Sequence, residues 1–184
     1  MAPRPRTLEI IRTALGALEE FGIAKPPVDS LACLKQRAEV EFFPLTEVDG
    51  STSYSKRTGK FFSVLSSKVN GGRLRWTAAH ELGHIYLHLP PGSRRPKTRY
   101  EEDREADRFA RNFLMPEEWV RREVSILSPH GELLIARDLG RLKEIFQVSW
   151  PALLRRLDEL GIQDWYVSDD QLGIEPPDVL VKLG

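Results

Sequence analysis

WTAAHELGHIYLH, residues Trp76 to His88, is the stretch of this sequence that decides its fold, because it joins a helical pattern to a metal-binding pattern. His80 and His84 are four residues apart, so on a helix they lie on one side and about 6 Å apart along the axis, where both imidazoles can reach one ion. Glu81 is turned by about 100° from His80 and can hold a water beside that ion. This His-Glu-x-x-His pattern indicates a zinc site in which the metal acidifies the water and the glutamate takes its proton.

The remaining positions of the same helix supply its buried face. Ala79, Leu82, Gly83 and Tyr86 form an apolar face that is separate from the two histidines, so the histidines do not face the core. Gly83 lowers helix propensity by roughly 1 kcal/mol relative to alanine, which predicts close packing of another element at that point. The alternative is a surface helix with incidental histidines.

The overall composition is that of an ordinary globular protein. The 184 residues are 41% hydrophobic and 29% charged, with 27 basic and 27 acidic side chains, so no excess of positive charge favours binding to nucleic acid. The single cysteine, Cys33, excludes an internal disulfide. The first helix carries Glu9, Glu19 and Glu20 where a signal peptide needs an apolar stretch, and no run is long enough to cross a membrane. We therefore expect a cytoplasmic protein without a membrane segment.

Hydrophobic periodicity predicts the other elements. Helices are expected at residues 7–21 and 101–114, and strands at 40–45 and 60–67, with a turn-forming segment at 47–59 between the strands. Thr77 is expected to cap the histidine helix after a tight turn in the preceding NGG sequence. Two more helices are expected around the sequence QVS, with Ser149 as the cap of the second.

A third metal ligand is expected to be a carboxylate. Only His88 and His130 remain as further nitrogen donors, and His88 is about 12 Å from His80 along a continuous helix, too far to share an ion. The sequence EEDREADRFARNFLMP, residues 101–116, supplies the carboxylates.

Several acidic residues of that helix are candidates. Glu102 and Asp103 project toward its buried side, and Glu105 lies nearer the edge. Asp103 and Asp107 form an i, i+4 pair, in which one carboxylate can bind metal while the other accepts a hydrogen bond from a ligating imidazole. The alternative is a solvated acidic first turn, which is favourable at a helix N-terminus.

Two segments together, RLRWTAAHELGH (73–84) and DREADRFARNFLMP (103–116), resemble the ImmA/IrrE family of zinc metallopeptidases. The similarity extends to PPVDSLA (26–32), to the strands and to FQVSWPALLRRLDELG (146–161), and so covers most of the chain. It implies an α+β fold with a thermolysin-like minimal metallopeptidase core, mainly helical, with a small antiparallel sheet beside the histidine helix. It also implies a bacterial setting in which a helix-turn-helix repressor of the XRE type is cleaved to release stress, phage or mobile-element genes.

The resemblance also implies roles for single residues. The ligand histidines of the family fall on His80 and His84, with Zn2+ as cofactor, and its general base falls on Glu81. Its ligand glutamate falls on Asp103, counted back from the shared Leu-Met-Pro, and Asp107 is expected to hold a ligating imidazole by a hydrogen bond. Because aspartate is one methylene shorter than glutamate, a neighbour could replace it, in the order Glu102 and then Glu105. The candidates for stabilising an oxyanion are Tyr54, Tyr86, Tyr100, His88 and Arg75.

The expected organisation is a metallopeptidase core at 1–125, a helix pair at 126–162 that packs on the core, and a tail at 163–184. That helix pair resembles a helix-turn-helix, so a DNA-binding regulator is one alternative. Asp158 and Glu159 follow Arg155 and Arg156 directly, which disfavours direct binding to nucleic acid. A zinc-bound partner or toxin–antitoxin module without catalysis is the other alternative, and the aspartate in the ligand position is its support.

Overall fold

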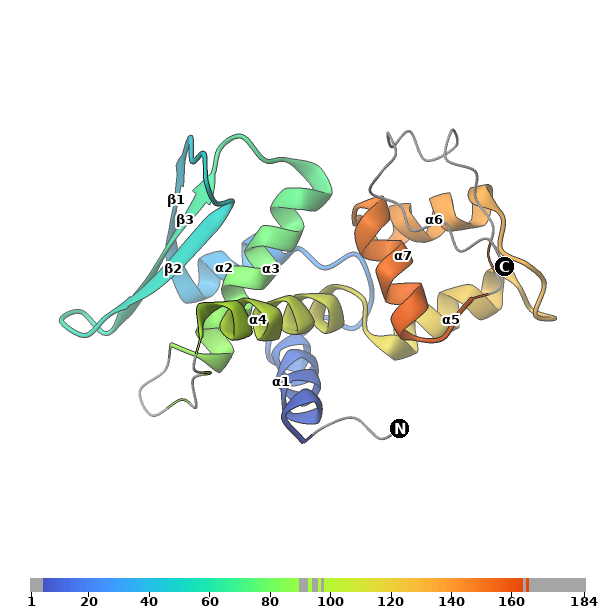
Figure 1. Ribbon diagram of the computed structural model, residues 1–184, viewed down its shortest axis with the longest axis horizontal. Coiled ribbons are helices and arrows are strands. Elements are labelled where there is room, and N and C mark those ends of the chain that lie inside the picture. The colour runs from blue at the N-terminus through green and yellow to red at the C-terminus, as the bar shows by residue number, and fades with distance from the viewer. Residues whose placement is uncertain (1–4, 90–92, 94–95, 97, 164, 166–184) are drawn as a thin grey trace.

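The computed structural model describes residues 5–89, 93, 96, 98–163 and 165. Among these residues, seven helices and three strands follow one another as α1 (Pro5–Glu20), α2 (Ser30–Arg37), β1 (Ala38–Phe43), β2 (Gly50–Ser55), β3 (Lys60–Ser66), α3 (Gly71–Leu87), α4 (Arg99–Leu114), α5 (Glu117–Leu127), α6 (Ala136–Phe146) and α7 (Trp150–Glu159). Figure 1 shows the sheet at one end beside α3, and α5 to α7 at the other end. The predicted, mainly helical α+β fold is confirmed. In the described ranges, no helix is long and apolar enough to cross a membrane.

The sheet is mixed, in the order β1-β3-β2. β2 pairs antiparallel with β3, but β1 pairs parallel with it, so the predicted antiparallel sheet is wrong for one of its two pairings. The chain leaves β1, returns along β2 at the far edge and enters β3 in the centre, which makes β1 and β3 run in the same direction. β2 itself lies in the 47–59 segment that was expected to be a turn, where the rings of Tyr54 and Phe61 pair across the strands at 5.0 Å.

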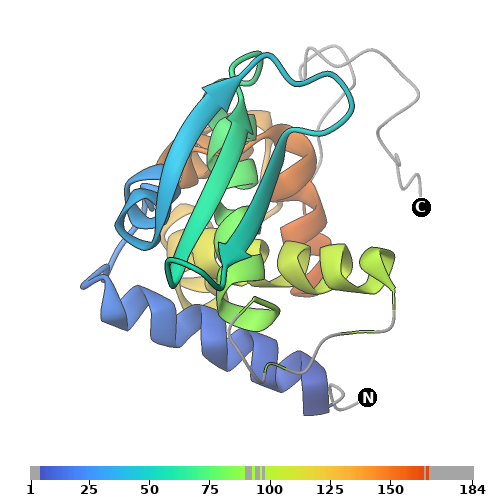
Figure 2. The same ribbon diagram turned by 90° about the vertical axis from the view of Figure 1, so that its left-hand side faces the viewer.

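Helix α3 connects the sheet to the helical part of the core. It lies behind the sheet in Figure 2, and α1 runs beneath them. On its other side α3 packs against α4 at Gly83, where a Cβ atom would come within 3.1 Å of the Ala106 Cα and 3.2 Å of the Phe109 Cβ. The close packing predicted at Gly83 is therefore confirmed. It sets α3 and α4 at a fixed distance, and each of these helices carries side chains of the site described below.

Replacing Gly83 by alanine is expected to lower the free energy of unfolding by about 1–3 kcal/mol, because the methyl group would overlap rigid backbone of α4. Gly16→Ala is the matched control: Gly16 is also inside a helix, but nothing lies within 4 Å of the added Cβ. That variant should gain about 0.5–1 kcal/mol from helix propensity alone. Denaturant unfolding of both variants measures the difference, and equal stabilities would contradict the packing argument.

Helix α3 begins at Gly71, so the predicted cap at Thr77 is wrong. Thr77 lies inside the helix, where its hydroxyl donates to the carbonyl of Arg73 at 3.0 Å. A tertiary contact requires glycine within the NGG sequence: a Cβ on Gly72 would come within 2.9 Å of the backbone nitrogen of Ser149. Arg73 is then bound by Asp49 just before β2, at 2.6 and 3.0 Å.

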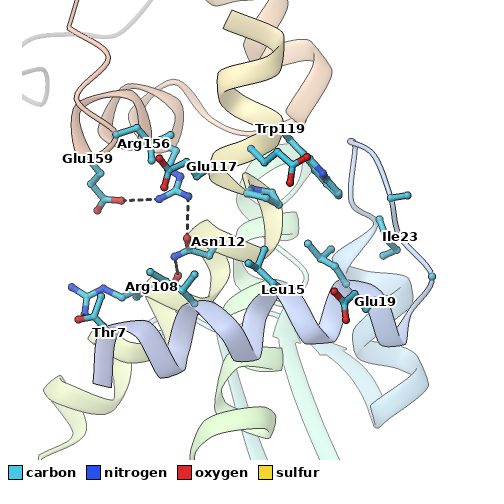
Figure 3. A pocket seen from close by; sticks show the side chains of 17 residues that line it. Thr7, Leu15, Glu19, Ile23, Arg108, Asn112, Glu117, Trp119, Arg156 and Glu159 are labelled. Atoms are coloured by element: carbon cyan, nitrogen blue, oxygen red, sulfur yellow. Dashed lines mark hydrogen bonds and ion pairs between the residues drawn. The ribbon is translucent and has the colours of Figure 1, made fainter. Parts of the chain in front are cut away.

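The two C-terminal helices form as predicted around Gln147, and the Ser149 side chain caps α7. Arg156 of α7 is 5% exposed and donates to the carbonyl of Met115 at 2.9 Å and to Asn112 at 3.0 Å, which attaches α7 to the end of α4 (Figure 3). The division into a core, a helix pair and a tail stays a prediction. All of the tail beyond residue 165 lies outside the described residues.

Candidate metal centre

His80, His84 and Asp103 bring three donor atoms together between α3 and α4. The two histidine Nε2 atoms are 3.1 Å apart, and the Asp103 Oδ1 lies 3.9 Å from the first and 3.4 Å from the second. Zinc binds nitrogen and oxygen at about 2.0–2.2 Å, so donors on a tetrahedron are roughly 3.3–3.6 Å apart. In the described part of the chain this group could therefore hold one metal ion.

The hydrogen bonds of the two imidazoles support this arrangement. His80 Nδ1 lies 2.9 Å from Asp107 Oδ1, and a carboxylate can only accept, so this nitrogen carries the proton. The Nε2 of the neutral His80 ring then presents its lone pair to the Nε2 of His84 at 3.1 Å, where either a proton on His84 or a metal ion can lie between the two nitrogens. This chemistry fits a metal ion, and Asp107 lies where the sequence predicted an orienting carboxylate.

The electrostatic environment differs between the two histidines. Burial opposes protonation of His80, but the hydrogen bond to Asp107 and the nearby carboxylates outweigh it and raise the pKa of His80 above its usual value. Burial, with the positive charge of His80 and His88, lowers the pKa of His84 to about 3. For Asp107, burial favours the neutral form, but the bond to His80 lowers its pKa overall. His84 is thus neutral near neutral pH, as a metal ligand must be.

The carboxylates considered as substitutes are placed differently from Asp103. Glu105 accepts two hydrogen bonds from Arg6 and one from His88. Neither Glu105 nor Glu102 belongs to the donor group found among the described residues. Asp103 reaches the histidines in spite of its short side chain because Gly83 lets α4 approach α3 closely. The roles of these residues as ligands stay predictions.

Glu81 is buried beside the donor atoms. It is 3% exposed, its Oε2 has no hydrogen-bond partner in the described residues, and burial raises its pKa. Gly50, at the start of β2, leaves the space that the carboxylate occupies, because a Cβ there would come within 2.8 Å of the Glu81 Oε1. A buried carboxylate oxygen without a partner costs free energy, and such atoms concentrate at functional sites.

The donors and Glu81 line a cavity of about 320 Å3. Sequence reasoning missed four residues of its wall, namely Val48, Asp49, Gly50 and Arg99. The i, i+4 spacing of Arg99 and Asp103 on one helix was a signal for the last of them. Val48, Asp49 and Gly50 lie where the chain enters β2, and they were missed because this strand was not predicted.

None of the five candidates for stabilising an oxyanion lines this cavity. Tyr86 donates to Glu20, Tyr100 is 70% exposed, and Arg75 donates to the carbonyl of Val28 and to Gln147. His88 is buried behind His84. Arg99 is a cation in the wall of the cavity and could stabilise an oxyanion there.

A larger groove, of about 1180 Å3, lies on another side of α4, between α1, the start of α5 and α7 (Figure 3). Leu15 and Trp119 give it apolar walls, and Arg108, Asn112 and Arg156 add polar groups. None of the donor residues lines it, so the smaller cavity is the candidate site.

Comparison with known proteins gives one family. The model described as the IrrE N-terminal-like domain, of the peptidase family M78, matches residues 33–158. No curated protein matches the chain. A solved structure described as a Mycobacterium tuberculosis transcriptional regulator is similar, with a TM-score of 0.55 and 15% identity over 85% of this chain and 52% of that one. The chain thus spans about half the length of that structure, and the likeness is one of fold.

Proposed function

Since the chain belongs to the IrrE N-terminal-like family of metallopeptidases, we propose that it is a zinc-dependent endopeptidase that cleaves a helix-turn-helix repressor. The match over residues 33–158 confirms the resemblance to the ImmA/IrrE family. One observation carries the proposal of catalysis: the buried, unpaired oxygen of Glu81 lines the same cavity as the three donors. A structural metal site has no need of such a base.

Zinc in this position would supply Lewis-acid chemistry, lowering the pKa of a water and polarising a peptide carbonyl. The side chains of the protein would transfer the proton from the water to the leaving amine. Glu81 Oε2 is free to accept a proton from the attacking water and to pass it to the leaving amine, and burial, which raises the pKa of Glu81, makes it a stronger base. Asp107 keeps the His80 ring in one orientation. Arg99 would stabilise the oxyanion.

The wall of the cavity suits an extended peptide. Val48, Asp49 and Gly50 line it where the chain enters β2, the edge strand of the sheet. In the described residues, the outer edge of β2 has no strand partner. A substrate segment can add to such an edge through main-chain hydrogen bonds, which would hold its backbone in register beside Glu81. This supports a polypeptide substrate rather than a small ester or amide.

A repressor as substrate is supported by the family resemblance, which associates such peptidases with XRE-type regulators in the bacterial cytoplasm. The similar solved structure is named as a transcriptional regulator, which agrees with a role of this fold in gene control. Direct DNA binding by this chain is disfavoured, because Arg156 is buried against α4 and α7 also carries Asp158 and Glu159. A module without catalysis would leave the unpaired Glu81 oxygen without a role.

The test is a census of new protein N-termini in cells that express the protein, set against cells that express Glu81→Gln. We expect a small number of cuts that depend on Glu81, at least one of them in a helix-turn-helix regulator. Identical profiles under zinc-replete and stress conditions would overturn the peptidase proposal. Cuts that depend on Glu81 but occur only in other proteins would support the peptidase activity and contradict a repressor as its substrate.

Replacing Gly50 by alanine is expected to reduce peptide hydrolysis by roughly 10- to 100-fold, because a displacement of about 1 Å of a catalytic group has effects of that size. The added methyl would lie 2.8 Å from both the Glu81 Oε1 and the Thr77 Cγ2, so the carboxylate must move. Zinc content should stay the same, because the three atoms nearest to the added methyl belong to Glu81 and Thr77 and none to a donor of the metal group. An active variant would show that Glu81 need not occupy its observed position.

A further inference from the structure

A line of hydrogen-bonded side chains leads from His84 away from the cavity to helix α1. His84 Nδ1 lies 3.0 Å from His88 Nδ1, and His88 Nε2 lies 3.1 Å from Glu105 Oε2. Glu105 in turn accepts from two nitrogens of Arg6, at 2.9 and 2.5 Å. The first two residues belong to α3 and its C-terminal end, the third to α4 and the last to α1.

We propose that His88, Glu105 and Arg6 form a relay that fixes the tautomer and the orientation of His84 for metal binding. The inference rests on the metal centre proposed above and deepens it. His88, Glu105 and Arg6 are positioning residues, since they act on the metal only through His84. Asp107 accepts a hydrogen bond directly from His80. For His84 the corresponding carboxylate is that of Glu105, and the imidazole of His88 lies between the two.

The protons can be assigned along the whole relay. A metal at His84 Nε2 takes the lone pair of that nitrogen, so the proton of the ring lies on Nδ1 and is donated to His88. His88 Nδ1 must then be bare, and its proton lies on Nε2, where it is donated to Glu105. The Glu105 carboxylate accepts from His88 and from Arg6, and every donor in the line has one acceptor. One direction of donation satisfies all the contacts.

Burial makes the relay more than a surface ion pair. His88 is 2% exposed, and the Glu105 and Arg6 side chains are largely shielded as well. A buried imidazole with a partner at each nitrogen cannot rotate without losing two hydrogen bonds. Arg6 also lies outside the 33–158 segment that matches the family, so in this chain α1 contributes to the metal centre.

The main variant is Glu105→Gln, which keeps the size of the side chain but removes the charge that anchors His88. The dissociation constant for Zn2+ is measured by competition with a chromogenic chelator, starting from metal-free protein whose folding is checked by thermal unfolding. We expect the constant to rise by about 10- to 100-fold, the usual effect of losing an outer hydrogen-bond partner of a metal ligand. The visible spectrum of the Co2+-loaded protein should change with it.

The matched control is Arg108→Gln. Arg108 also joins α4 to α1, through a hydrogen bond to Thr7 at 3.1 Å, but it has no part in the relay. This variant should bind Zn2+ as the wild type does. In addition, His88→Gln should bind more tightly than His88→Leu, because the amide oxygen can still accept the His84 proton.

Nitrogen-15 NMR of the zinc-loaded wild type tests the relay without any substitution. The relay predicts that His84 is protonated at Nδ1 and His88 at Nε2; the opposite tautomer of His88 would overturn it. Equal Zn2+ affinities of Glu105→Gln and Arg108→Gln would also overturn it, and would leave the metal centre standing. If the wild-type protein bound no Zn2+, that result would contradict the metal centre itself, and therefore the relay as well.

Discussion

Replacing Glu81 by glutamine is expected to lower the rate of peptide hydrolysis by a factor of about 10² to 10⁴, the usual contribution of a general base. The carboxamide fills the same space but cannot accept a proton from water. Glu81 Oε2 has no hydrogen-bond partner in the described residues, so few contacts that hold the fold should change. The rate is measured on a substrate identified from the new N-termini, and the zinc content of the purified variant is measured in parallel.

The zinc content separates two roles of this residue. One zinc ion per chain in the inactive Glu81→Gln variant is the result expected of a base. Loss of the ion together with the activity would make Glu81 a ligand instead. Cleavage by Glu81→Gln at the wild-type rate would show that Glu81 takes no part in the reaction.

Replacing Asp103 by alanine is expected to weaken zinc binding by more than the roughly 10- to 100-fold that loss of an outer hydrogen-bond partner costs, because a ligand itself is lost. The Asp103 Oδ1 lies within 3.9 Å of both histidine Nε2 atoms. Its side chain is 42% exposed, so its removal should leave the core intact. Competition with a chromogenic chelator measures the affinity.

Glu102→Ala is the comparison for this experiment, because Glu102 precedes Asp103 on the same helix and is the first substitute by sequence. It should leave the affinity unchanged. The reverse pattern, with zinc lost from Glu102→Ala and kept by Asp103→Ala, would assign the third ligand to Glu102.

Much of the candidate site follows from local spacing. His80 and His84 meet because four residues make about one helical turn, and this holds wherever the helix lies. Asp107 was found by the same i, i+4 rule relative to Asp103, and Gly83 indicated the close approach of α4. Such features depend on one helix at a time, and a sequence read without its fold can supply them.

Other parts of the fold depend on contacts distant in sequence. β2 is rich in serine and has no apolar alternation, so only its pairing with β3 makes it a strand, and Gly50 and the cavity wall were missed with it. The first turn of α3 contains Gly72, whose backbone lies close to that of residue 149, a contact that no local pattern indicates. His88 and Glu105 are 17 residues apart in the chain, and Arg6 is 99 residues from Glu105, so no local pattern could join them.

The most direct test of the metal centre is anomalous diffraction at the zinc absorption edge from crystals of the zinc-loaded protein. We predict one peak, about 2.0–2.2 Å from the Nε2 atoms of His80 and His84 and from a carboxylate oxygen of Asp103, with a water within hydrogen-bonding distance of Glu81. No peak in crystals grown with excess zinc, or a peak held by a different set of side chains, would contradict a zinc site at His80, His84 and Asp103.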